Sequence, residues 1–225
     1  MTKGMDMGVE ALFDLSQTIA AGIFQGCSYP WEVLPKINEY ILSIGSELSL
    51  DEYDHPAEDI WIAKEAVVFA SAYVTGPCII GKGAEVRHCA FIRGSAIVGN
   101  HAVVGNSTEL KNVILFNEVQ VPHYNYVGDS ILGYRSHMGA GAITSNVKSD
   151  KMPVNVKNGC KIIATGMKKF GAILGDYVEI GCNSVLNPGT IVGRNSNIYP
   201  TSCVRGVVPA NSIYKNSSNI IVKLK

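Results

Sequence analysis

Residues 60–104 read IWIAKE AVVFAS AYVTGP CIIGKG AEVRHC AFIRGS AIVGNH AVV, and the third letter of every six-residue block is Ile or Val. From the second block onward the first letter is Ala or Cys. A period of six fits neither an α-helix, with its period of about 3.6, nor one long alternating strand. It fits a three-sided coil whose sides are short strands and whose corners are turns. The sequence therefore predicts a hexapeptide solenoid.

The same frame continues to Leu110 and returns at Leu174. Its later members are Ile180, Leu186, Val192, Ile198 and Val204. Glycine often follows a frame residue directly, where a tight bend favours a residue without a side chain. An ordinary β-sandwich would have to keep this register by chance over many consecutive steps, so we expect an all-β solenoid, a parallel β-helix.

The composition limits the partners. The 225 residues are 47% hydrophobic and carry a formal net charge of zero. No global positive field is therefore available to attract nucleic acid or an anionic membrane. The sequence shows no secretory signal pattern and no apolar run long enough to span a bilayer. We expect a cytoplasmic protein, and we expect its six cysteines, which form no CxxC pair, to be reduced thiols that mostly lie in the core.

The frame divides the chain into three regions. Residues 1–58 lack the repeat, and their apolar spacing predicts two helices, separated by residues 26–30, that cap the open end of the solenoid. Residues 59–206 are expected to form the β-helix, with 147–171 as a lysine-rich extruded loop. Residues 207–225 form a tail in which an apolar run is expected to fold back as a strand.

One outward column of the solenoid is apolar. Three hexapeptides make a coil of about 18 residues, so residues that far apart stack at the strand spacing of about 4.8 Å. The column contains Trp61, Ile79, Ile97 and Leu115. An outward apolar stripe usually marks an interface, so we expect self-association. Coverage by the N-terminal helices or the tail is the alternative.

The same spacing of about 18 residues stacks two cationic side chains on neighbouring coils. Arg93 falls beside Lys111, and like charges on neighbouring strands repel unless an anion lies between them. A bound phosphate or carboxylate would resolve the repulsion, because arginine binds such groups through two donors. Pairing with Glu109 would resolve it equally well.

The repeat is interrupted after Phe116. Pro122 takes the next frame position, His123 follows it, and the aliphatic positions resume early at Val127. Irregular backbone in a regular scaffold often places a functional side chain. His123 is therefore a candidate general base near neutral pH, and a structural hydrogen-bonding role is its alternative.

Three stretches carry a resemblance to a known family: ELKN at 109–112, PHYNYVGD at 122–129 and MGAGAITSN at 138–146. With the spacing of Arg93, they resemble the acetyltransferase domain of the bifunctional UDP-N-acetylglucosamine pyrophosphorylase/glucosamine-1-phosphate N-acetyltransferase. The resemblance covers residues 60–206. It implies a left-handed β-helix, a homotrimer, acetyl-CoA as co-substrate in a groove between subunits, and no metal requirement for acetyl transfer.

The resemblance also implies roles for individual residues. It makes His123 the general base, with Asn146 close to the reacting groups and Glu109 orienting or polarising its neighbours. The residues expected to bind the sugar phosphate are Arg93, Lys111, Tyr126 and His137. Those expected to contact acetyl-CoA are Ala140, Cys182 and Pro200.

The sequence departs from the family at several of these positions. His137 replaces a sugar-contacting asparagine, Val147 replaces a tyrosine, and Cys182 and Pro200 stand where the family has small acetyl-CoA contacts. The long loop resembles archaeal sugar-phosphate nucleotidyltransferases that carry an acetyltransferase tail, especially at 168–172. No stretch resembles the glycine-rich loop of the pyrophosphorylase half, so we expect no UTP-dependent activity.

Three functions follow as hypotheses. The first is an acetyl-CoA-dependent N-acetyltransferase on an amino-sugar 1-phosphate, with glucosamine 1-phosphate ahead of galactosamine 1-phosphate. The second is a catalytically inactive or regulatory scaffold, which the changes at His137 and Val147 support. The third is a zinc-dependent carbonic anhydrase-like enzyme, because this solenoid also carries such sites. Its candidate ligands, which lack close ligand spacing, are His88, His101, His123 and His137.

Overall fold

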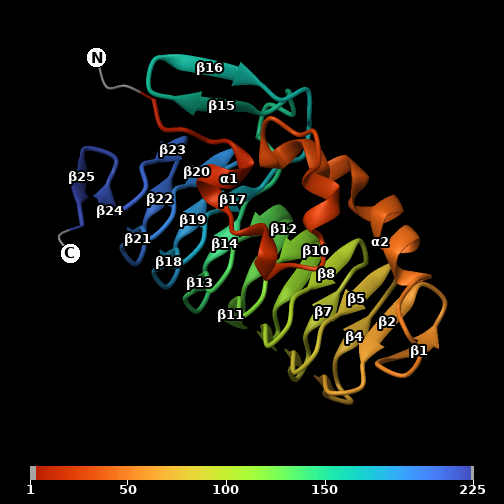
Figure 1. Cartoon of the computed structure of the whole chain (residues 1–225). Helices are drawn as coiled ribbons and strands as arrows, with labels where there is room; N and C mark the ends of the chain where they lie inside the picture. Colours follow the sequence, from red (N-terminus) through yellow and green to blue (C-terminus); the bar gives the residue numbers. More distant parts are fainter. Residues whose placement is uncertain (1–3, 224–225) are drawn as a thin grey trace.

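The computed structural model describes residues 4–223, most of which form a left-handed parallel β-helix with three flat faces (Figure 1). Parallel strands stack coil upon coil along each face. This arrangement confirms the hexapeptide solenoid predicted from the repeat.

Each face is a column of short strands. Face 1 consists of β2 (Ile60–Ala63), β5 (Cys78–Ile80), β8 (Ala96–Val98), the second halves of β10 (Glu109–Leu115) and β12 (Tyr126–Leu132), β17 (Ala172–Leu174), β20 (Thr190–Val192) and β23 (Val207–Val208). Face 2 consists of β3 (Val67–Val68), β6 (Glu85–Val86), β9 (Val103–Asn106), β11 (Gln120–His123), β13 (His137–Met138), β18 (Glu179–Ile180), β21 (Asn197–Ile198) and β24 (Ser212–Asn216). Face 3 consists of β4 (Tyr73–Val74), β7 (Phe91–Ile92), the first halves of β10 and β12, β14 (Ile143–Thr144), β19 (Val185–Leu186) and β22 (Cys203–Val204).

The frame residues fill the interior of the coil. Ile80, Val98 and Leu115 stack in one ladder on face 1, and all three are fully buried. Small residues such as Ala84 and Ala102 are also fully buried and leave room for the chain to turn. Each fully buried aliphatic side chain contributes about 1.5–3 kcal/mol relative to an exposed one, so the repeated Ile and Val positions hold the coils together.

The frame shortens by one residue at two corners in the middle of the solenoid, and by two residues between Val204 and Val208. Leu115 pairs with Val98 on one side and with Leu132 on the other, so Leu115 and Leu132 are the frame residues of their coils. The step from Leu110 to Leu115 therefore takes five residues rather than six, and so does the step from Val127 to Leu132. The sequence pattern placed the break after Phe116, and this was wrong. The break lies at the corners that contain residues 112 and 129, and the step around residue 123 keeps its six residues.

Phe116 accounts for the misplaced break. Its ring lies outside the frame, 4.9 Å from the ring centroid of Phe13 and 6.0 Å from that of Phe24. Both partners belong to the N-terminal segment, which contains α1 (Val9–Leu12), the 3₁₀ turns η1 (Leu15–Gln17), η2 (Ala21–Phe24) and η3 (Pro30–Lys36), and α2 (Ile37–Gly45). Phe116 therefore serves the contact with this segment rather than the interior of the coil.

Of the two helices expected in the N-terminal segment, only the second is present, as η3 running into α2. The first is broken into α1 and two 3₁₀ turns. The Asp14 side chain accepts a hydrogen bond from the backbone N–H of Ser16, and the Thr18 hydroxyl accepts one from that of Ala20. Such local bonds compete with helical ones, which accounts for the interruption.

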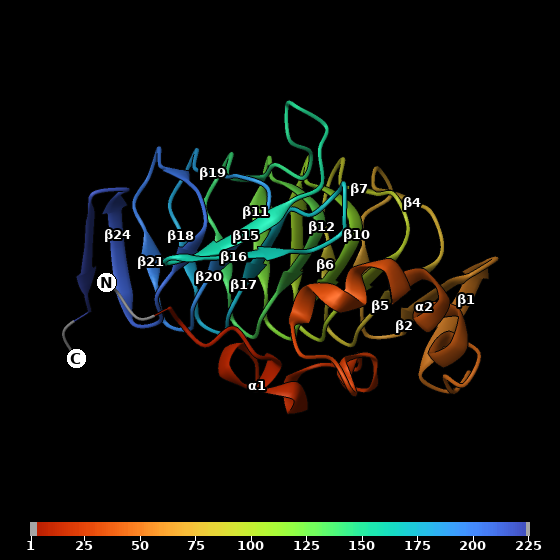
Figure 2. The same ribbon diagram turned by 90° about the horizontal axis from the view of Figure 1, so that it is seen from above.

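The N-terminal segment lies along face 1 instead of capping the open end (Figure 2). Helix α2 packs on β5, β8 and β10, and η3 packs on β12. At the end of the solenoid, β1 (Tyr53–Ala57) pairs antiparallel with β2. The expectation that the helices cap the open end is therefore wrong.

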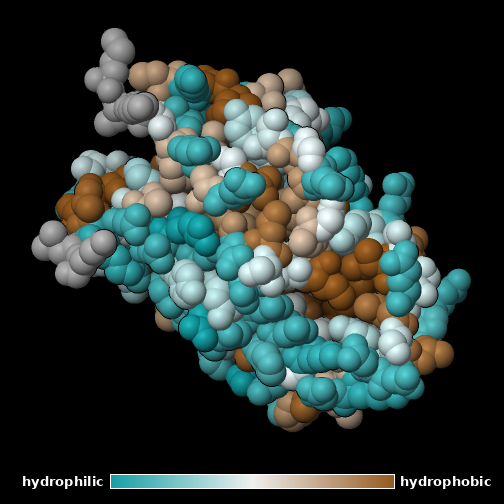
Figure 3. All heavy atoms as spheres, in the orientation of Figure 1, coloured by the Kyte–Doolittle hydropathy of each residue, from teal (hydrophilic) through white to brown (hydrophobic). Residues whose placement is uncertain are grey.

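The N-terminal segment covers the apolar stripe that the sequence predicted on face 1. Ile79 and Ile97 are fully buried and Trp61 is 7% exposed, while the next member is Ile114 rather than Leu115 because of the shortened corner. Hydrophobic residues gather in a hollow beside α2 (Figure 3). The expected self-association through this stripe is wrong, and coverage by the N-terminal segment is confirmed.

The loop at 147–171 folds into an antiparallel hairpin of β15 (Asn155–Asn158) and β16 (Lys161–Ala164). Val154, Val156 and Phe170 are fully buried, so the loop packs on the solenoid rather than extending freely into solvent. The tail forms β25 (Asn219–Val222), which pairs antiparallel with β24 and confirms the predicted strand.

The cysteines are all free thiols, but most do not lie in the core. Cys78 is fully buried, and burial raises the pKa of its thiol to about 12. Cys27 is half-buried, and the exposed ones are Cys89, Cys160, Cys182 and Cys203. The expectation of mainly buried cysteines is wrong because four of them occupy corners and outer positions. Within residues 4–223, no helix is long and apolar enough to cross a membrane.

Candidate active site

One corner of the solenoid gathers four of the predicted site residues. They are His123, Ala140, Cys182 and Pro200, and we call them the corner row. The strand registers of β11, β13, β18 and β21 place them on successive coils between faces 2 and 3. Coils are spaced by about 4.8 Å, so the corner row forms a straight edge parallel to the solenoid axis.

Backbone hydrogen bonds tie this edge together. The N–H of Gly141 donates to the carbonyl of His123 at 3.0 Å, and the N–H of Asn183 donates to that of Ala140 at 2.8 Å. Thr201 continues the pattern by donating to the carbonyl of Cys182 at 2.8 Å. The edge is therefore a rigid support on which an extended ligand can lie.

Asn125 fixes the corner from inside, and the sequence pattern assigned it no role. Its amide nitrogen donates to the carbonyls of Gly139 and Ala142, at 2.9 and 3.0 Å, and its oxygen accepts from the backbone N–H of His123 at 3.1 Å. Asn125 is 2% exposed, so these bonds are shielded from water. The side chain of His123 is exposed, and within residues 4–223 no hydrogen bond holds its imidazole.

The predicted phosphate-binding cations lie on face 3, next to each other and each paired with an acid. Arg93 Nη1 lies 2.7 Å from Glu109 Oε1, and Lys111 Nζ lies 3.0 Å from Asp129 Oδ1. The hydrogen bond to Glu109 raises the pKa of Arg93. Of the two ways to relieve the repulsion in this cation stack, the structure bears out pairing with Glu109.

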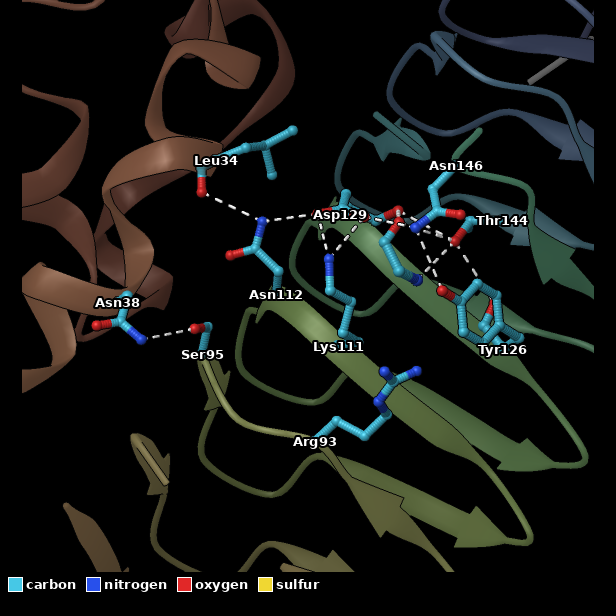
Figure 4. A network of polar contacts seen from close by, with 12 residues as sticks. Leu34, Asn38, Arg93, Ser95, Lys111, Asn112, Tyr126, Asp129, Thr144 and Asn146 are labelled. Carbon is cyan, nitrogen blue, oxygen red and sulfur yellow. Dashed lines mark hydrogen bonds and ion pairs between the residues drawn. The ribbon is translucent and has the colours of Figure 1, made fainter. Parts of the chain in front are cut away.

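Asp129 is the centre of this part of the site, and the sequence pattern did not reveal it. Its carboxylate accepts hydrogen bonds from Lys111, Asn112 and Asn146, which all point toward it (Figure 4). The Asn146 amide also donates to the Tyr126 hydroxyl at 3.2 Å. Burial is the largest cause of the raised pKa of Tyr126, so its phenol keeps its proton and can still donate to a ligand.

His137 lies on face 2, on the other side of the corner. Its Nδ1 is 2.8 Å from Glu179 Oε2, and the two residues line a cleft of about 330 Å³. The remaining lining residues are Glu118, Gln120 and Arg135. Within one chain, the structure thus brings Arg93, Glu109, Lys111, Tyr126 and Asn146 together on face 3 and leaves His137 apart on face 2.

The three-sided coil with its six-residue frame defines a hexapeptide-repeat solenoid protein. A family model described as the GMPPB C-terminal domain matches residues 74–187, just over half of the chain. The chain belongs to this family.

The chain is also similar to longer proteins. It is 32% identical over 205 residues to the bifunctional protein GlmU of Methanococcus maripaludis strain C5, which covers 90% of this chain and 50% of that protein. It is 33% identical over 112 residues to the bifunctional sugar-1-phosphate nucleotidylyltransferase/acetyltransferase of Sulfurisphaera tokodaii, covering 50% and 28%. The chain spans about half the length of the first of these relatives.

Among solved structures, it resembles the acetyltransferase domain of PglB from Neisseria gonorrhoeae in complex with acetyl coenzyme A. The sequence identity is 15%, the TM-score is 0.39, and the match covers 72% of this chain and 56% of that one.

Proposed function

We propose that this chain transfers an acetyl group from acetyl-CoA to the amine of an amino-sugar 1-phosphate, with glucosamine 1-phosphate as the first candidate. The observation that carries the proposal is the corner row, which aligns a solvent-accessible His123 with Ala140, Cys182 and Pro200 on one rigid edge. The relative from Sulfurisphaera, which is named a sugar-1-phosphate nucleotidylyltransferase/acetyltransferase, supports the same chemistry.

In this mechanism, His123 acts as general base. The sugar amine attacks the thioester carbonyl, a carbon–nitrogen bond forms, and His123 accepts the amine proton. The carbon–sulfur bond then breaks, and the CoA thiolate takes up a proton. General-base assistance typically contributes about 100- to 10,000-fold, and holding both reactants on one edge removes much of the entropic cost of their encounter.

Arg93 and Lys111 bind the sugar phosphate in this proposal. Arg93 keeps 47% of its side chain exposed although it pairs with Glu109. Exposed ion pairs contribute little net stability, so a doubly charged phosphate can replace Glu109 as the partner of Arg93 at small cost. Lys111 is 26% exposed, so one side of it remains open to the ligand while Asp129 holds the other.

The proposal includes a homotrimer with acetyl-CoA in a groove between subunits. Faces 2 and 3 meet at the corner row, while face 1 is covered by the chain's own N-terminal segment. A second copy placed beside the corner would turn the exposed edge into a groove. It would also allow His137 of one copy to approach the face 3 residues of another, which a single chain does not permit.

The test is release of CoA thiol from acetyl-CoA with a panel of amino-sugar 1-phosphates. The native chain and His123→Ala are compared, with His101→Asn as the matched histidine variant at a different corner. Release with one sugar that is retained in His101→Asn and reduced at least 100-fold in His123→Ala supports the proposal. A folded native chain that releases no thiol with any sugar contradicts it and favours the scaffold hypothesis.

Zinc content provides a separate readout. Within residues 4–223, no group of three His, Cys, Asp or Glu side chains is arranged to hold a metal ion. Stoichiometric zinc in the purified chain, together with carbon dioxide hydration, would favour the carbonic anhydrase-like alternative over acetyl transfer.

A further inference from the structure

Asp129 occupies one of the two corners that are shortened by one residue, and its side chain is only 5% exposed. Lys111 Nζ donates to its two oxygens at 3.0 and 3.2 Å, and Asn112 Nδ2 donates at 2.9 Å. Asn146 Nδ2 is the third donor. Three donors from three positions thus converge on one buried carboxylate.

The shortened corners create this convergence. Asn112 and Asp129 occupy equivalent corners of neighbouring coils, and both have positive φ angles, 56° and 46°. Asn and Asp tolerate this left-handed conformation better than other residues with side chains. The tight turn aims the Asn112 side chain at Asp129 and leaves the carboxylate facing Lys111 and Asn146 (Figure 4).

A buried carboxylate costs free energy unless its oxygens are satisfied by donors. Here the three donors satisfy the carboxylate, and the same hydrogen bonds restrict the conformations of the donor side chains. A lysine side chain gives up about 1.5–2 kcal/mol of rotamer entropy when it is fixed, and the Asp129 partner has already fixed Lys111 before any ligand arrives. Asn146 is held in the same way, with Tyr126 as its second partner.

The same network reaches the N-terminal segment. Asn112 Nδ2 also donates to the carbonyl of Leu34 in η3 at 3.2 Å. Leu34 is 2% exposed, so this contact lies inside the seam between the segment and face 1. One side chain therefore joins the covering segment to the carboxylate that holds the site residues.

We propose that Asp129 is the positioning residue of the acyl-transfer site. It holds Lys111 in place for the sugar phosphate and Asn146 in place beside the reacting groups, and Asn112 links that arrangement to the N-terminal segment. This inference rests on the proposed function, because that function gives Lys111 its ligand.

Asp129→Asn is the first test, and Asp176→Asn is its matched control. Asp176 is a fully buried aspartate that binds Arg194 and the backbone N–H groups of Asp14 and Tyr134, away from the site. Both variants are expected to lower the melting temperature. Only Asp129→Asn is expected to raise the KM for the sugar phosphate and lower kcat, with a loss of about 10- to 100-fold in kcat/KM and an unchanged KM for acetyl-CoA.

A double-mutant cycle separates positioning from a general structural effect. In a Lys111→Met background, Asp129→Asn should cost much less than it does in the native chain, since its main partner is already gone. Full additivity of the two changes would overturn the inference. So would equal kinetic effects of Asp129→Asn and Asp176→Asn. Should Asp129→Asn fail to fold, Asn112→Gly suits the positive φ, removes one donor and the link to Leu34, and should give the same KM pattern at smaller size.

Calorimetry that measures binding of glucosamine 1-phosphate distinguishes a failure of the proposed acetyl transfer from a failure of the proposed positioning by Asp129. A native chain that binds this ligand without transferring acetyl groups contradicts the proposed function alone. Binding that weakens in Asp129→Asn and persists in Asp176→Asn then supports positioning by Asp129. Equal binding by the native chain and Asp129→Asn overturns it, and a native chain that neither binds nor transfers overturns both.

Discussion

The ring centroids of Trp31 and Phe170 lie 5.9 Å apart, and both rings are almost completely buried. Trp31 belongs to η3, and Phe170 closes the loop that carries the β15–β16 hairpin. The backbone N–H of Phe170 also donates to the carbonyl of Asn146 at 2.9 Å. This contact therefore joins the N-terminal segment, the hairpin loop and the candidate site.

Phe170→Ala is expected to destabilise the fold by about 3–5 kcal/mol, because it removes a buried aromatic ring and leaves a cavity. The free energy of unfolding in urea would measure this. Ile162→Ala, at a position 67% exposed on the same hairpin loop, is the control and should change stability by less than about 0.5 kcal/mol. An equal effect of both variants would contradict the packing described for Phe170.

Ile97→Asp is expected to prevent stable folding rather than to dissociate an oligomer. Ile97 is fully buried beneath the N-terminal segment, and an unpaired charge there has no donor to satisfy it. Circular dichroism and light scattering would distinguish the outcomes. A folded Ile97→Asp chain of lower mass than the native one would restore the stripe as an interface. Val67→Asp, at a position 52% exposed, should remain folded.

Cys182 should react with a thiol reagent and be protected by acetyl-CoA, since it is exposed and lies in the corner row. Cys160 is exposed on the hairpin turn and should react at the same rate with and without acetyl-CoA. Cys78, whose pKa is raised to about 12 by burial, should stay unmodified until the chain unfolds. Peptide mass spectrometry would follow each site. Protection of Cys160 together with Cys182 would argue against binding along the corner row.

His137→Asn is expected to change the sugar preference without changing the KM for acetyl-CoA. The substitution introduces the residue type that the resembled family uses there, and it removes the imidazole that pairs with Glu179. The ratio of kcat/KM for glucosamine 1-phosphate and galactosamine 1-phosphate would measure the effect, expected at about 10-fold. An unchanged ratio in the assembled protein would show that His137 does not contact the sugar.

The repeat was strong enough to predict the coil, because Ile or Val at every sixth position matches the period of neither a helix nor a long strand. It could not place the shortened corners, since Ile114, Leu115 and Phe116 are consecutive apolar residues and any of them could take the frame position. The choice depends on Phe13 and Phe24, which are distant in sequence and pack on Phe116.

The strand register was uncertain by one residue, and this uncertainty also hid part of the site. Asp129 belongs to a motif that the sequence shows, but only the true register reveals that it faces Lys111 and Asn146. Asn125 was hidden for a different reason, since its role consists of bonds to backbone carbonyls of the next coil. By contrast, the resemblance named all four members of the corner row, although only Cys182 and Pro200 keep the 18-residue spacing of a regular coil.

The way in which the N-terminal segment covers face 1 determines the order in which parts of the chain can fold. Met5 pairs with Asn158, and the N–H of Asp14 donates to Asp176, across 153 and 162 positions of sequence. A chain emerging from the ribosome therefore presents residues 5–14 long before the coils that bind them exist, whereas α2 can cover β5, β8 and β10 as soon as those strands form. Until the later coils form, the apolar side chains of residues 5–14 stay uncovered, in a state that invites aggregation or binding by a chaperone. Met5 and Asp14 are therefore among the last residues to find their native contacts, although they are synthesised long before the residues that bind them.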